Sequence, residues 1–350
     1  MKKIIFAFLM FAAISCTKNV TSKNELNASA TSIVENSVAL NGSTKFGSII
    51  LGNFTNDQRV AIAKKLNVKY VRGTITMDKW INKFTPYETY VKNGIQVVLN
   101  VCSALQTNTP VAFLRDLTNY RQKFNSITDK YKPEVIVVEN EEINPNYHTG
   151  PLTDYINMLQ AALDVCHSKG IKVTNGGIYG GQLETLAYRY LQRKGQNRAD
   201  SFANNCMTYS QIKDAQTPNR NPSLEWKVRQ LDTLLNFYIN LDYINIHLYE
   251  PFNPNVDPST VTSATPVVAA DIQEYLIART GKPVMTNETT PRNNVSPNLV
   301  TSVLKEYDRL NFPYAIWFNN DIDGSKSLYD LNTGALLNTG VAYSNFTGTY

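Results

Sequence analysis

The segment Val135-Ile-Val-Val-Glu-Asn-Glu141 joins four β-branched residues to a polar ending. Residues of this kind favour strands because their stiff side chains pack well on a pleated surface. The segment Pro283-Val-Met-Thr-Asn-Glu288 repeats the pattern later in the chain. Each segment therefore predicts a short strand whose last residues are an Asn-Glu pair.

Similar runs recur at eight places, and a loop and a segment of helical periodicity follow each of them. The predicted strands are residues 46–51, 70–75, 95–101, 135–141, 171–175, 243–249, 284–288 and 314–318. Alternation of strand and helix over eight units predicts the α/β class, as one closed (β/α)₈ barrel. No glycine-rich nucleotide fingerprint follows the first strand, and Gly176-Gly177 after the fifth strand are interpreted as loop glycines.

The longest connection, residues 179–224, follows the fifth predicted strand. It contains a predicted helix at 183–194 and then a polar stretch. Functional loops of a (β/α)₈ barrel lie at the C-terminal ends of its strands. We therefore expect this extended loop to cover the active site.

Residues 1–15 have the form of a signal peptide, with two lysines followed by an apolar run at 4–14. The ending Ala12-Ala-Ile-Ser-Cys16 resembles a bacterial lipoprotein signal. The resemblance implies that Cys16 becomes the lipidated first residue and that the protein is an outer-membrane lipoprotein of the cell envelope. An ordinary secretory signal that contains a cysteine is the alternative.

Residues 16–41 are polar and have no sustained period, which predicts a flexible tether. Residues 42–350 remain for the barrel, a normal length for this fold. The formal charge of +5 includes lysines of the signal and tether, so it gives no argument for nucleic-acid binding. The few cysteines and three histidines have no metal-site spacing, and we expect neither a metal nor a cofactor; besides Cys16 they are Cys102, Cys166, Cys206, His148, His167 and His247.

Alternation along a strand indicates which side chains can enter the mouth of the barrel. Residues 243–249 place Asn245, His247 and Tyr249 on one face and isoleucine and leucine on the other. A polar face is costly to bury, so His247 and Tyr249 are predicted to line a site, with a structural histidine as the alternative. The same rule places Glu139 with Glu141, and Glu288 with Val284 and Thr286.

This order of motifs resembles clan A of the glycoside hydrolases, over residues 46–350: Asn-Glu on the fourth strand, His-x-Tyr on the sixth, Glu on the seventh and Trp on the eighth. The resemblance implies that Glu141 is the general acid/base and Glu288 the nucleophile of a retaining glycosidase. It also implies substrate-binding or supporting roles for Arg72, Asn140, His247, Tyr249 and Trp317.

By this resemblance Asn140 would bind the 2-hydroxyl of the sugar and Tyr249 would hold the nucleophile. Trp317 would be the aromatic platform under the sugar, with a core aromatic as the alternative. Arg72 would brace the nucleophile, and it could equally neutralise a buried carboxylate for stability.

Two positions depart from the pattern. Many members have proline where this chain has Glu142, and many have histidine where Asn100 stands. Glu142 makes a crowded cluster with Glu139 and Glu141, which leaves the acid assignment less secure than that of Glu288. Like charges this close raise at least one pKa, and a proton donor needs a raised pKa, so we expect one at Glu141.

The sequence thus predicts a monomeric retaining hydrolase of a poly- or oligosaccharide, which meets the membrane only through its lipid anchor. The alternative is a surface glycan-binding lipoprotein that keeps the barrel without turnover. The intact carboxylate pair favours the enzyme, because a binding protein has no chemical need for both groups. A barrel enzyme of other chemistry would need a strand-end lysine or a ligand cluster, and the sequence has neither in a suitable place.

Overall fold

The structure is a computed structural model that describes residues 42–82, 85–104, 109–249, 267–291, 295–319 and 327–349. All of these belong to one compact unit, Ala39–Tyr350. The predicted signal, Cys16 and the predicted tether lie outside the described residues. Within the described part, no helix is both long and apolar enough to cross a membrane.

Eight parallel strands form the barrel, in the hydrogen-bonded order β7-β5-β3-β2-β1-β10-β9-β8. Isolated parallel bridges, Thr174 with Tyr243 and Ile178 with Ile246, join the two end strands. The strands are β1 (Lys45–Ser48), β2 (Tyr70–Thr76), β3 (Gln96–Cys102), β5 (Val135–Val138), β7 (Lys172–Asn175), β8 (Ile244–Leu248), β9 (Val284–Thr289) and β10 (Tyr314–Trp317). The predicted (β/α)₈ barrel is confirmed. Two short strands, β4 (Val111–Ala112) and β6 (His148–Thr149), pair with each other outside it.

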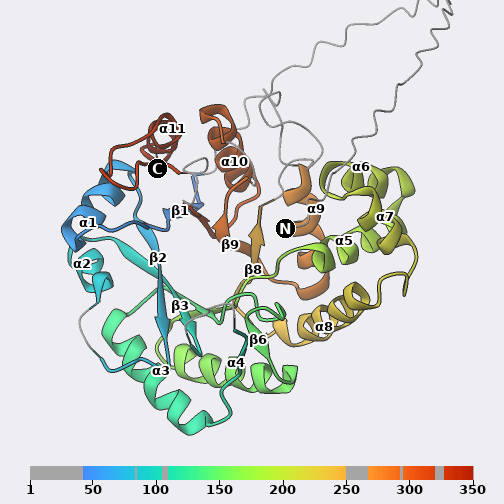
Figure 1. Ribbon diagram of the computed structural model, residues 1–350, viewed down its shortest axis with the longest axis horizontal. Coiled ribbons are helices and arrows are strands. Elements are labelled where there is room, and N and C mark those ends of the chain that lie inside the picture. Colours follow the sequence, from blue (N-terminus) through green and yellow to red (C-terminus); the bar gives the residue numbers. More distant parts are fainter. Residues whose placement is uncertain are drawn as a thin grey trace, which may run out of the picture. The chain divides into compact units, whose positions relative to one another are not determined.

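The helices surround the strands, as the view along the barrel shows (Figure 1). Several begin at a side-chain cap; Thr55, for example, forms a reciprocal capping box with Gln58. The described helices are α1 (Asn56–Lys65), α2 (Pro86–Lys92), α3 (Leu117–Tyr131), α4 (Leu152–His167), α5 (Gly181–Lys194), α6 (Gln196–Cys206), α7 (Tyr209–Gln216), α8 (Pro222–Tyr238), α9 (Val267–Thr280), α10 (Pro297–Arg309) and α11 (Asn338–Thr347).

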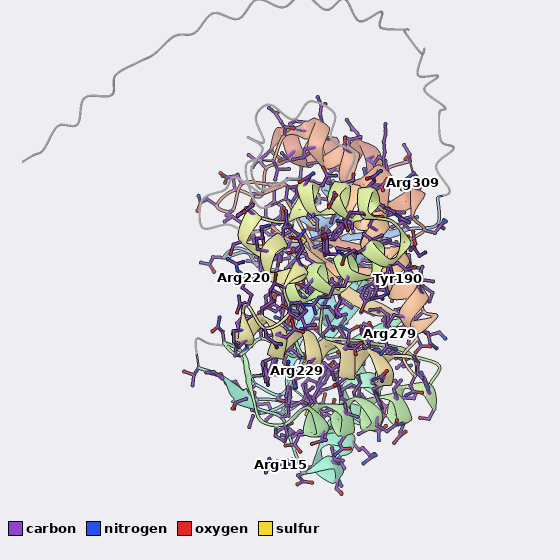
Figure 2. All side chains as sticks on the ribbon, turned by 90° about the vertical axis from the view of Figure 1, so that its right-hand side faces the viewer. Arg115, Tyr190, Arg220, Arg229, Arg279 and Arg309 are labelled. Atoms are coloured by element: carbon purple, nitrogen blue, oxygen red, sulfur yellow. The ribbon has the colours of Figure 1, made fainter. Side chains whose placement is uncertain are left out.

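The long connection after the fifth barrel strand differs from its prediction. Its polar stretch folds into α6 and α7, which pack on α5, with α6 also against α9, in the outer helical layer (Figure 1). Arg198 of α6 pairs with Asp271 of α9 at 2.5 Å. Tyr190 of α5, labelled in Figure 2, donates from its hydroxyl to Glu274 of α9 at 3.2 Å. These side chains join neighbouring helices. The expected cover is therefore wrong for α6 and α7, whereas Tyr179, at the start of the connection, lies close to Glu141.

Apolar side chains fill two layers, one between strands and helices and one inside the barrel. The inner layer is small and consists of Val98, Val135, Val137, Met285, Tyr314 and Ile316. Lys45, at the start of β1, lies beneath it and forms an ion pair with Glu134, with its ammonium 5.0 Å from the ring centre of Tyr314. Polar groups therefore seal the N-terminal end of the barrel, while its C-terminal end is left for the site.

The C-terminal helix α11 packs so closely that one position tolerates no side chain. A Cβ atom on Gly340 would lie 1.8 Å from the main-chain oxygen of Leu328. We expect Gly340→Ala to lower the free energy of unfolding by about 1–3 kcal/mol or more, because the helix must shift. Val341→Ala is the matched control in the same helix, where the side chain is 46% exposed, and it should change stability by less than about 0.5 kcal/mol. Equal denaturation midpoints for the two variants would contradict this packing.

Candidate active site

Glu141 and Glu288 meet at the C-terminal end of the barrel, together with His247. One oxygen of each carboxylate and one ring nitrogen of His247 all lie within 4.8 Å of one another. Parallel strands bring their C-terminal ends to the same rim, so residues from β8, β9 and the turn after β5 converge there. The site residues predicted from three separate strands are thus neighbours in space.

Glu288 reaches this rim through a β-bulge. Asn245 pairs with Met285, but two residues later His247 pairs with Glu288, so the register between β8 and β9 shifts by one. Met285 lies inside the barrel and Asn287 contacts His247, yet Glu288 also faces the site. The alternation that placed Glu288 with Val284 and Thr286 is therefore wrong, because a bulge re-aims the residues after it.

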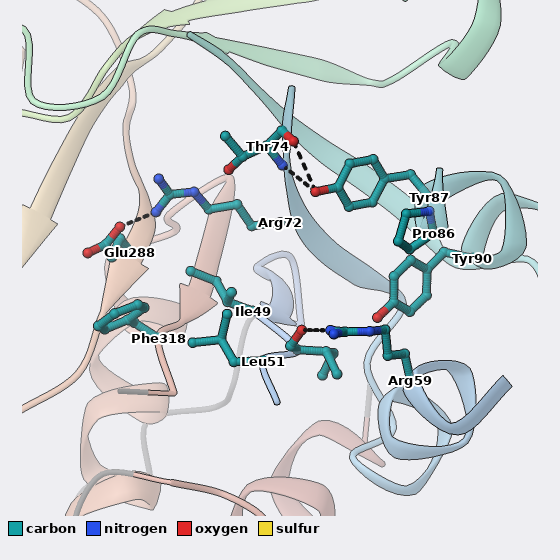
Figure 3. Close-up of a pocket in the computed structure, with 11 residues that line it drawn as sticks. Ile49, Leu51, Arg59, Arg72, Thr74, Pro86, Tyr87, Tyr90, Glu288 and Phe318 are labelled. Atoms are coloured by element: carbon teal, nitrogen blue, oxygen red, sulfur yellow. Dashed lines mark hydrogen bonds and ion pairs between the residues drawn. The ribbon is translucent and has the colours of Figure 1, made fainter. Parts of the chain in front are cut away.

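Both oxygens of Glu288 are held by other side chains. Arg72 of β2 donates to Oε2, as Figure 3 shows, and the hydroxyl of Tyr249 donates to Oε1. Arg72 also donates to Oδ1 of Asn140 at 2.7 Å. The side chains of Arg72 and Glu288 are only 7% and 13% exposed, so the ion pair offsets the cost of removing each charge from water.

Glu141 lies on a turn beyond the strand. β5 ends at Val138, and both Glu139 and Glu141 adopt the left-handed backbone region, with φ of 67° and 49°. The predicted strand to residue 141, and the shared face for the two glutamates, are therefore wrong. Oε1 of Glu141 lies 3.1 Å from Nδ1 of His247, and Oε2 accepts from the amide of Asn144 at 2.7 Å.

The other two glutamates of the cluster point away from this pair and are buried. Ser103 donates to Oε1 of Glu139 from its main-chain N–H at 2.8 Å and also from its hydroxyl. Tyr238 donates to Glu142, and so does the amide of Asn175 at 3.1 Å. Burial raises the pKa of Glu139 to about 7 and also raises the pKa of Glu142.

Glu141 does not have the raised pKa that the sequence predicted for it. Burial acts to raise this pKa, but the hydrogen bond and charge of His247, the hydrogen bond from Asn144 and the charge of Arg72 together outweigh burial, and the pKa is lowered. The crowding of carboxylates raises a pKa, as expected, but at Glu139 and Glu142. In this structure, therefore, the hydrogen-bond donors and positive charges around Glu141, His247 first among them, outweigh the effect of burial on its pKa.

Trp317 does not lie at the mouth of the barrel. Tyr314 and Ile316 point into the barrel, so the alternate residue Trp317 points outward, where it is 1% exposed and meets the ring of Tyr343 edge-on. A platform role for Trp317 is therefore excluded by its burial, and the core-aromatic alternative describes it. The next residue, Phe318, lines the pocket beside Glu288 instead.

A pocket of about 400 Å³ opens beside Glu288, on the side of β1, β2 and α2. Its labelled lining residues in Figure 3 include Ile49, Thr74, Tyr87 and Phe318 around Arg72. A second cavity of about 250 Å³ shares Arg72 and Thr74 and extends to Asn100 and Asn140. Glu288 therefore lies at the edge of a cleft that carries aromatic rings and hydrogen-bonding groups, and Asn140, the residue before Glu141, lines the adjoining cavity.

Sequence reasoning missed several groups around the pair. Asn144, which binds Glu141, gives no sequence signal because it lies in an irregular turn. Asn245 was placed on the polar face of its strand and Asn287 belongs to the second Asn-Glu pair, so both had a signal without an assigned role. Gly177 was interpreted as a loop glycine, yet a Cβ atom there would lie 2.2 Å from Nε2 of His247.

Glu141, His247 and Glu288 are also close enough together to be considered as ligands of a cation. However, the Arg72 guanidinium already binds Glu288, and its positive charge opposes a second cation at the same carboxylate. His247 likewise already contacts Glu141 and Asn287 through its two ring nitrogens. Each of the two carboxylates is therefore held by hydrogen bonds from neighbouring protein side chains.

No family model and no curated protein matches this sequence. Solved structures do resemble it. A β-glycosidase, BGL167, aligns with a TM-score of 0.55 and 10% identity, over 84% of this chain and 85% of that one. An endo-β-1,3-glucanase of GH128 subgroup II from Sorangium cellulosum aligns at 0.50 and 14%, over 86% and 97%. A GH5-4 broad-specificity endoglucanase from Clostridium acetobutylicum aligns at 0.50 and 12%, over 86% and 96%. At these identities the likeness shows that the chain shares their barrel fold.

The raised pKa of Glu139 predicts a pH-dependent stability. Between its usual value of 4.5 and about 7, the folded protein holds a proton that the unfolded chain releases, so this group's contribution to stability falls as pH rises. Glu139→Gln removes that titration. We expect its free energy of unfolding, relative to the wild type, to increase steadily from pH 4.5 to 7 in denaturant titrations.

Glu225→Gln is the control for this measurement. Arg189 lowers the pKa of Glu225 below its usual value of 4.5, so this group is ionised in the folded protein while the unfolded chain still loses its remaining proton just above pH 4.5. The difference between Glu225→Gln and the wild type should therefore fall slightly at the acid end of the range, opposite to the trend expected for Glu139→Gln, and stay flat above about pH 5.5. A flat difference for Glu139→Gln would mean that Glu139 does not carry its proton into this range.

Proposed function

We propose that this protein is a retaining glycoside hydrolase that cleaves O-glycosidic bonds of a poly- or oligosaccharide. The observation that carries the proposal is the distance between oxygens of Glu141 and Glu288, at most 4.8 Å. Retaining enzymes hold their two carboxyl groups about 5–5.5 Å apart, whereas inverting enzymes leave about 6.5–9.5 Å for a water. The spacing therefore supports direct attack on the sugar by one of the two groups.

In the proposed mechanism Glu288 is the nucleophile. Arg72 and Tyr249 hold one oxygen each and orient the carboxylate toward the anomeric carbon. Glu141 gives a proton to the leaving oxygen as the glycosidic bond breaks and a glycosyl ester forms on Glu288. Glu141 then takes a proton from water, whose oxygen attacks the anomeric carbon and releases Glu288.

The cleft supports a carbohydrate as the substrate. Phe318 and Tyr87 line the pocket beside Glu288, and aromatic rings suit the apolar faces of sugars. Asn140 and Arg72 line the adjoining cavity and offer hydrogen bonds for hydroxyl groups. The similar structures named as a β-glycosidase and endoglucanases support a β-linked substrate, as a proposal for this chain.

The protein is further proposed to act as a monomer anchored to the cell envelope through Cys16. A glycan-binding lipoprotein without turnover is the other candidate, because binding needs the cleft but not the carboxylate pair. The presence of both carboxylates, each with its own hydrogen-bond partners, favours the enzyme.

Two substitutions test the assigned roles on aryl glycosides and on plant, algal and host polysaccharides. We expect Glu288→Ala to abolish hydrolysis and azide to restore part of it, because azide can take the place of the missing carboxylate. Glu141→Ala should slow substrates with poor leaving groups by about 10²–10⁴-fold and activated aryl glycosides much less.

Glu225→Gln, on the outer helix α8, is the activity control. Unchanged turnover in Glu288→Ala would contradict the nucleophile assignment. Binding without turnover by the wild type across the whole panel would favour the glycan-binding candidate.

Substitutions at Phe318 and Trp317 test which of these two neighbouring rings contacts the sugar. Phe318→Ala should raise KM several-fold, because ring contacts contribute about 0.5–1.5 kcal/mol. It should lower the free energy of unfolding less than removal of a fully buried ring would, because Phe318 is half-buried and meets the ring of Tyr249 edge-on. Trp317→Phe should lower the free energy of unfolding and leave KM nearly unchanged, because the side chain is buried against Tyr343. Steady-state kinetics and denaturant titrations measure both quantities, and the reverse pattern would place Trp317 in the site.

A further inference from the structure

Three wholly buried asparagines, Asn175, Asn245 and Asn287, lie in a row across β7, β8 and β9. The main-chain N–H of Asn245 donates to Oδ1 of Asn175 at 2.8 Å. The main-chain N–H of Asn287 donates to Oδ1 of Asn245 at 2.9 Å. A main-chain N–H can only donate, so each of these contacts decides which end of the amide is the oxygen.

The orientation of Asn245 decides that of Asn287. With its oxygen on the main chain of β9, Asn245 turns its amide nitrogen to Oδ1 of Asn287 at 2.8 Å. The reverse orientation of Asn287 would set two NH₂ groups against each other. Asn287 therefore keeps its oxygen toward Asn245, although its Nδ2 then has no hydrogen-bond partner among the described residues.

Asn287 therefore presents an oxygen to His247. Its Oδ1 lies 2.9 Å from Nε2 of His247. Two acceptors cannot face each other at that distance, so Nε2 must carry a hydrogen. Gly177 leaves room for the ring at this nitrogen, since a Cβ atom there would lie 2.2 Å away.

The opposite nitrogen of the ring, Nδ1, faces Glu141. The amide of Asn144 is fixed in the same way, because the main-chain N–H of Asn146 donates to its Oδ1 at 3.0 Å, and it donates to the other oxygen of Glu141. Nδ1 lies 3.1 Å from Oε1 of Glu141. A bare ring nitrogen and a carboxylate oxygen would both be acceptors, so one proton lies between them. The pair is either imidazolium with carboxylate or neutral imidazole with carboxylic acid.

We propose that Asn245 and Asn287 are positioning residues that keep a hydrogen on Nε2 of His247, so that His247 and Glu141 share the single proton that Glu141 delivers to the leaving group. The delivery step rests on the proposed function, whereas the fixed hydrogen on Nε2 does not. In the resting protein, His247 would thus carry on Nδ1 the proton that Glu141 later delivers.

The proton balance is closed over one turnover. The proton moves from Nδ1 to Glu141 and from there to the leaving oxygen, which leaves the imidazole neutral with its hydrogen on Nε2. In the second half, Glu141 takes a proton from the attacking water and returns it to Nδ1. The lowered pKa of Glu141 in the free protein is then no obstacle, because its proton is one hydrogen bond away.

Other titratable groups face this pair and share its titration. Glu142 acts on His247 from the turn after β5. Glu141 interacts electrostatically with Arg72, His148, Tyr147 and Tyr179, and Glu288 lies beside it. The effect of Asn287 on the titration of the pair is therefore measured by comparing variants in which all of these groups are unchanged.

The direct test is the nitrogen spectrum of ¹⁵N-histidine-labelled purified protein, in which only three histidines contribute. His167→Gln, at a side chain that is 48% exposed, removes one signal set and helps assignment. We expect Nε2 of His247 to carry a hydrogen at every pH at which the protein is folded. A bare Nε2 would overturn the proposal, whether or not the protein hydrolyses any glycan.

Asn287→Ala should allow the form with the hydrogen on Nδ1, since the acceptor at Nε2 is gone and Glu141 accepts from Nδ1. Asn319→Ala is the matched control, because Asn319 is another wholly buried asparagine, just after β10, that hydrogen-bonds Ser48 and Leu328. It should leave the His247 signals unchanged. An unaltered His247 spectrum in Asn287→Ala would also overturn the proposal.

Kinetics test the delivery step. Asn287→Ala should lower kcat by about tenfold or more with little change in KM, because general acid catalysis contributes about 10²–10⁴-fold. Asn287→Asp, which is isosteric and keeps the acceptor, holds the proton on the pair more tightly, so the basic limb of the kcat/KM profile should move to higher pH.

In Asn287→Ala the same limb should move to lower pH. If the basic limb of the kcat/KM profile stays at the same pH in both variants, the proposal of a shared proton is wrong. A merely structural role of Asn287 would lower activity without moving this limb. A fixed hydrogen on Nε2 in a protein that hydrolyses nothing would refute the proposed function and leave the positioning of His247 standing.

Discussion

The cost of removing carboxylates from water governs the whole C-terminal end of this barrel. Glu139, Glu141, Glu142 and Glu288 all lie there, and the first three are buried. Each charge must be paired or neutralised. Arg72 pairs with Glu288 and the lowered pKa of Glu141 reflects its bond to His247, whereas burial raises the pKa of the other two. Two different solutions to one physical problem thus separate the Glu141–Glu288 pair from the other two glutamates.

The same groups that orient the site also complete the sheet. Regular pairing is absent between β7 and β8, and Asn175 bridges that gap with hydrogen bonds to both the N–H and the oxygen of Asn245. Asn245 in turn binds the main chain of β9, where its register with β8 shifts. Barrel closure and the orientation of His247 therefore depend on one set of amides. Losing an amide there affects stability and chemistry together, which is why a spectroscopic readout is needed to separate them.

The architecture also shows which elements form the cleft and which do not. The extra helices α6 and α7 belong to the outer layer, so they enlarge the molecule without contributing to the described cleft. The pocket is formed by the segment after β1, by residues of α1, β2 and α2, and by Glu288 of β9 with Phe318 after β10. Half-buried rings beside a paired arginine offer apolar contact and hydrogen bonding rather than a free charge, and this chemistry would suit the faces and hydroxyl groups of a sugar.

The sequence by itself determined the eight strands and the convergence of their polar ends, because β-branched runs and parallel connectivity are local properties that add up to one topology. It also named Glu141, Glu288, His247, Tyr249 and Arg72, which do meet in the structure. Only the tertiary structure decided how they meet. Alternation holds only along a regular strand, and it ends at the turn after Val138 and at the bulge in β9. Likewise, only packing against α11 showed that Trp317 faces the core and leaves Phe318 to the pocket, because the side of a strand that faces a helix depends on the register of the closed barrel.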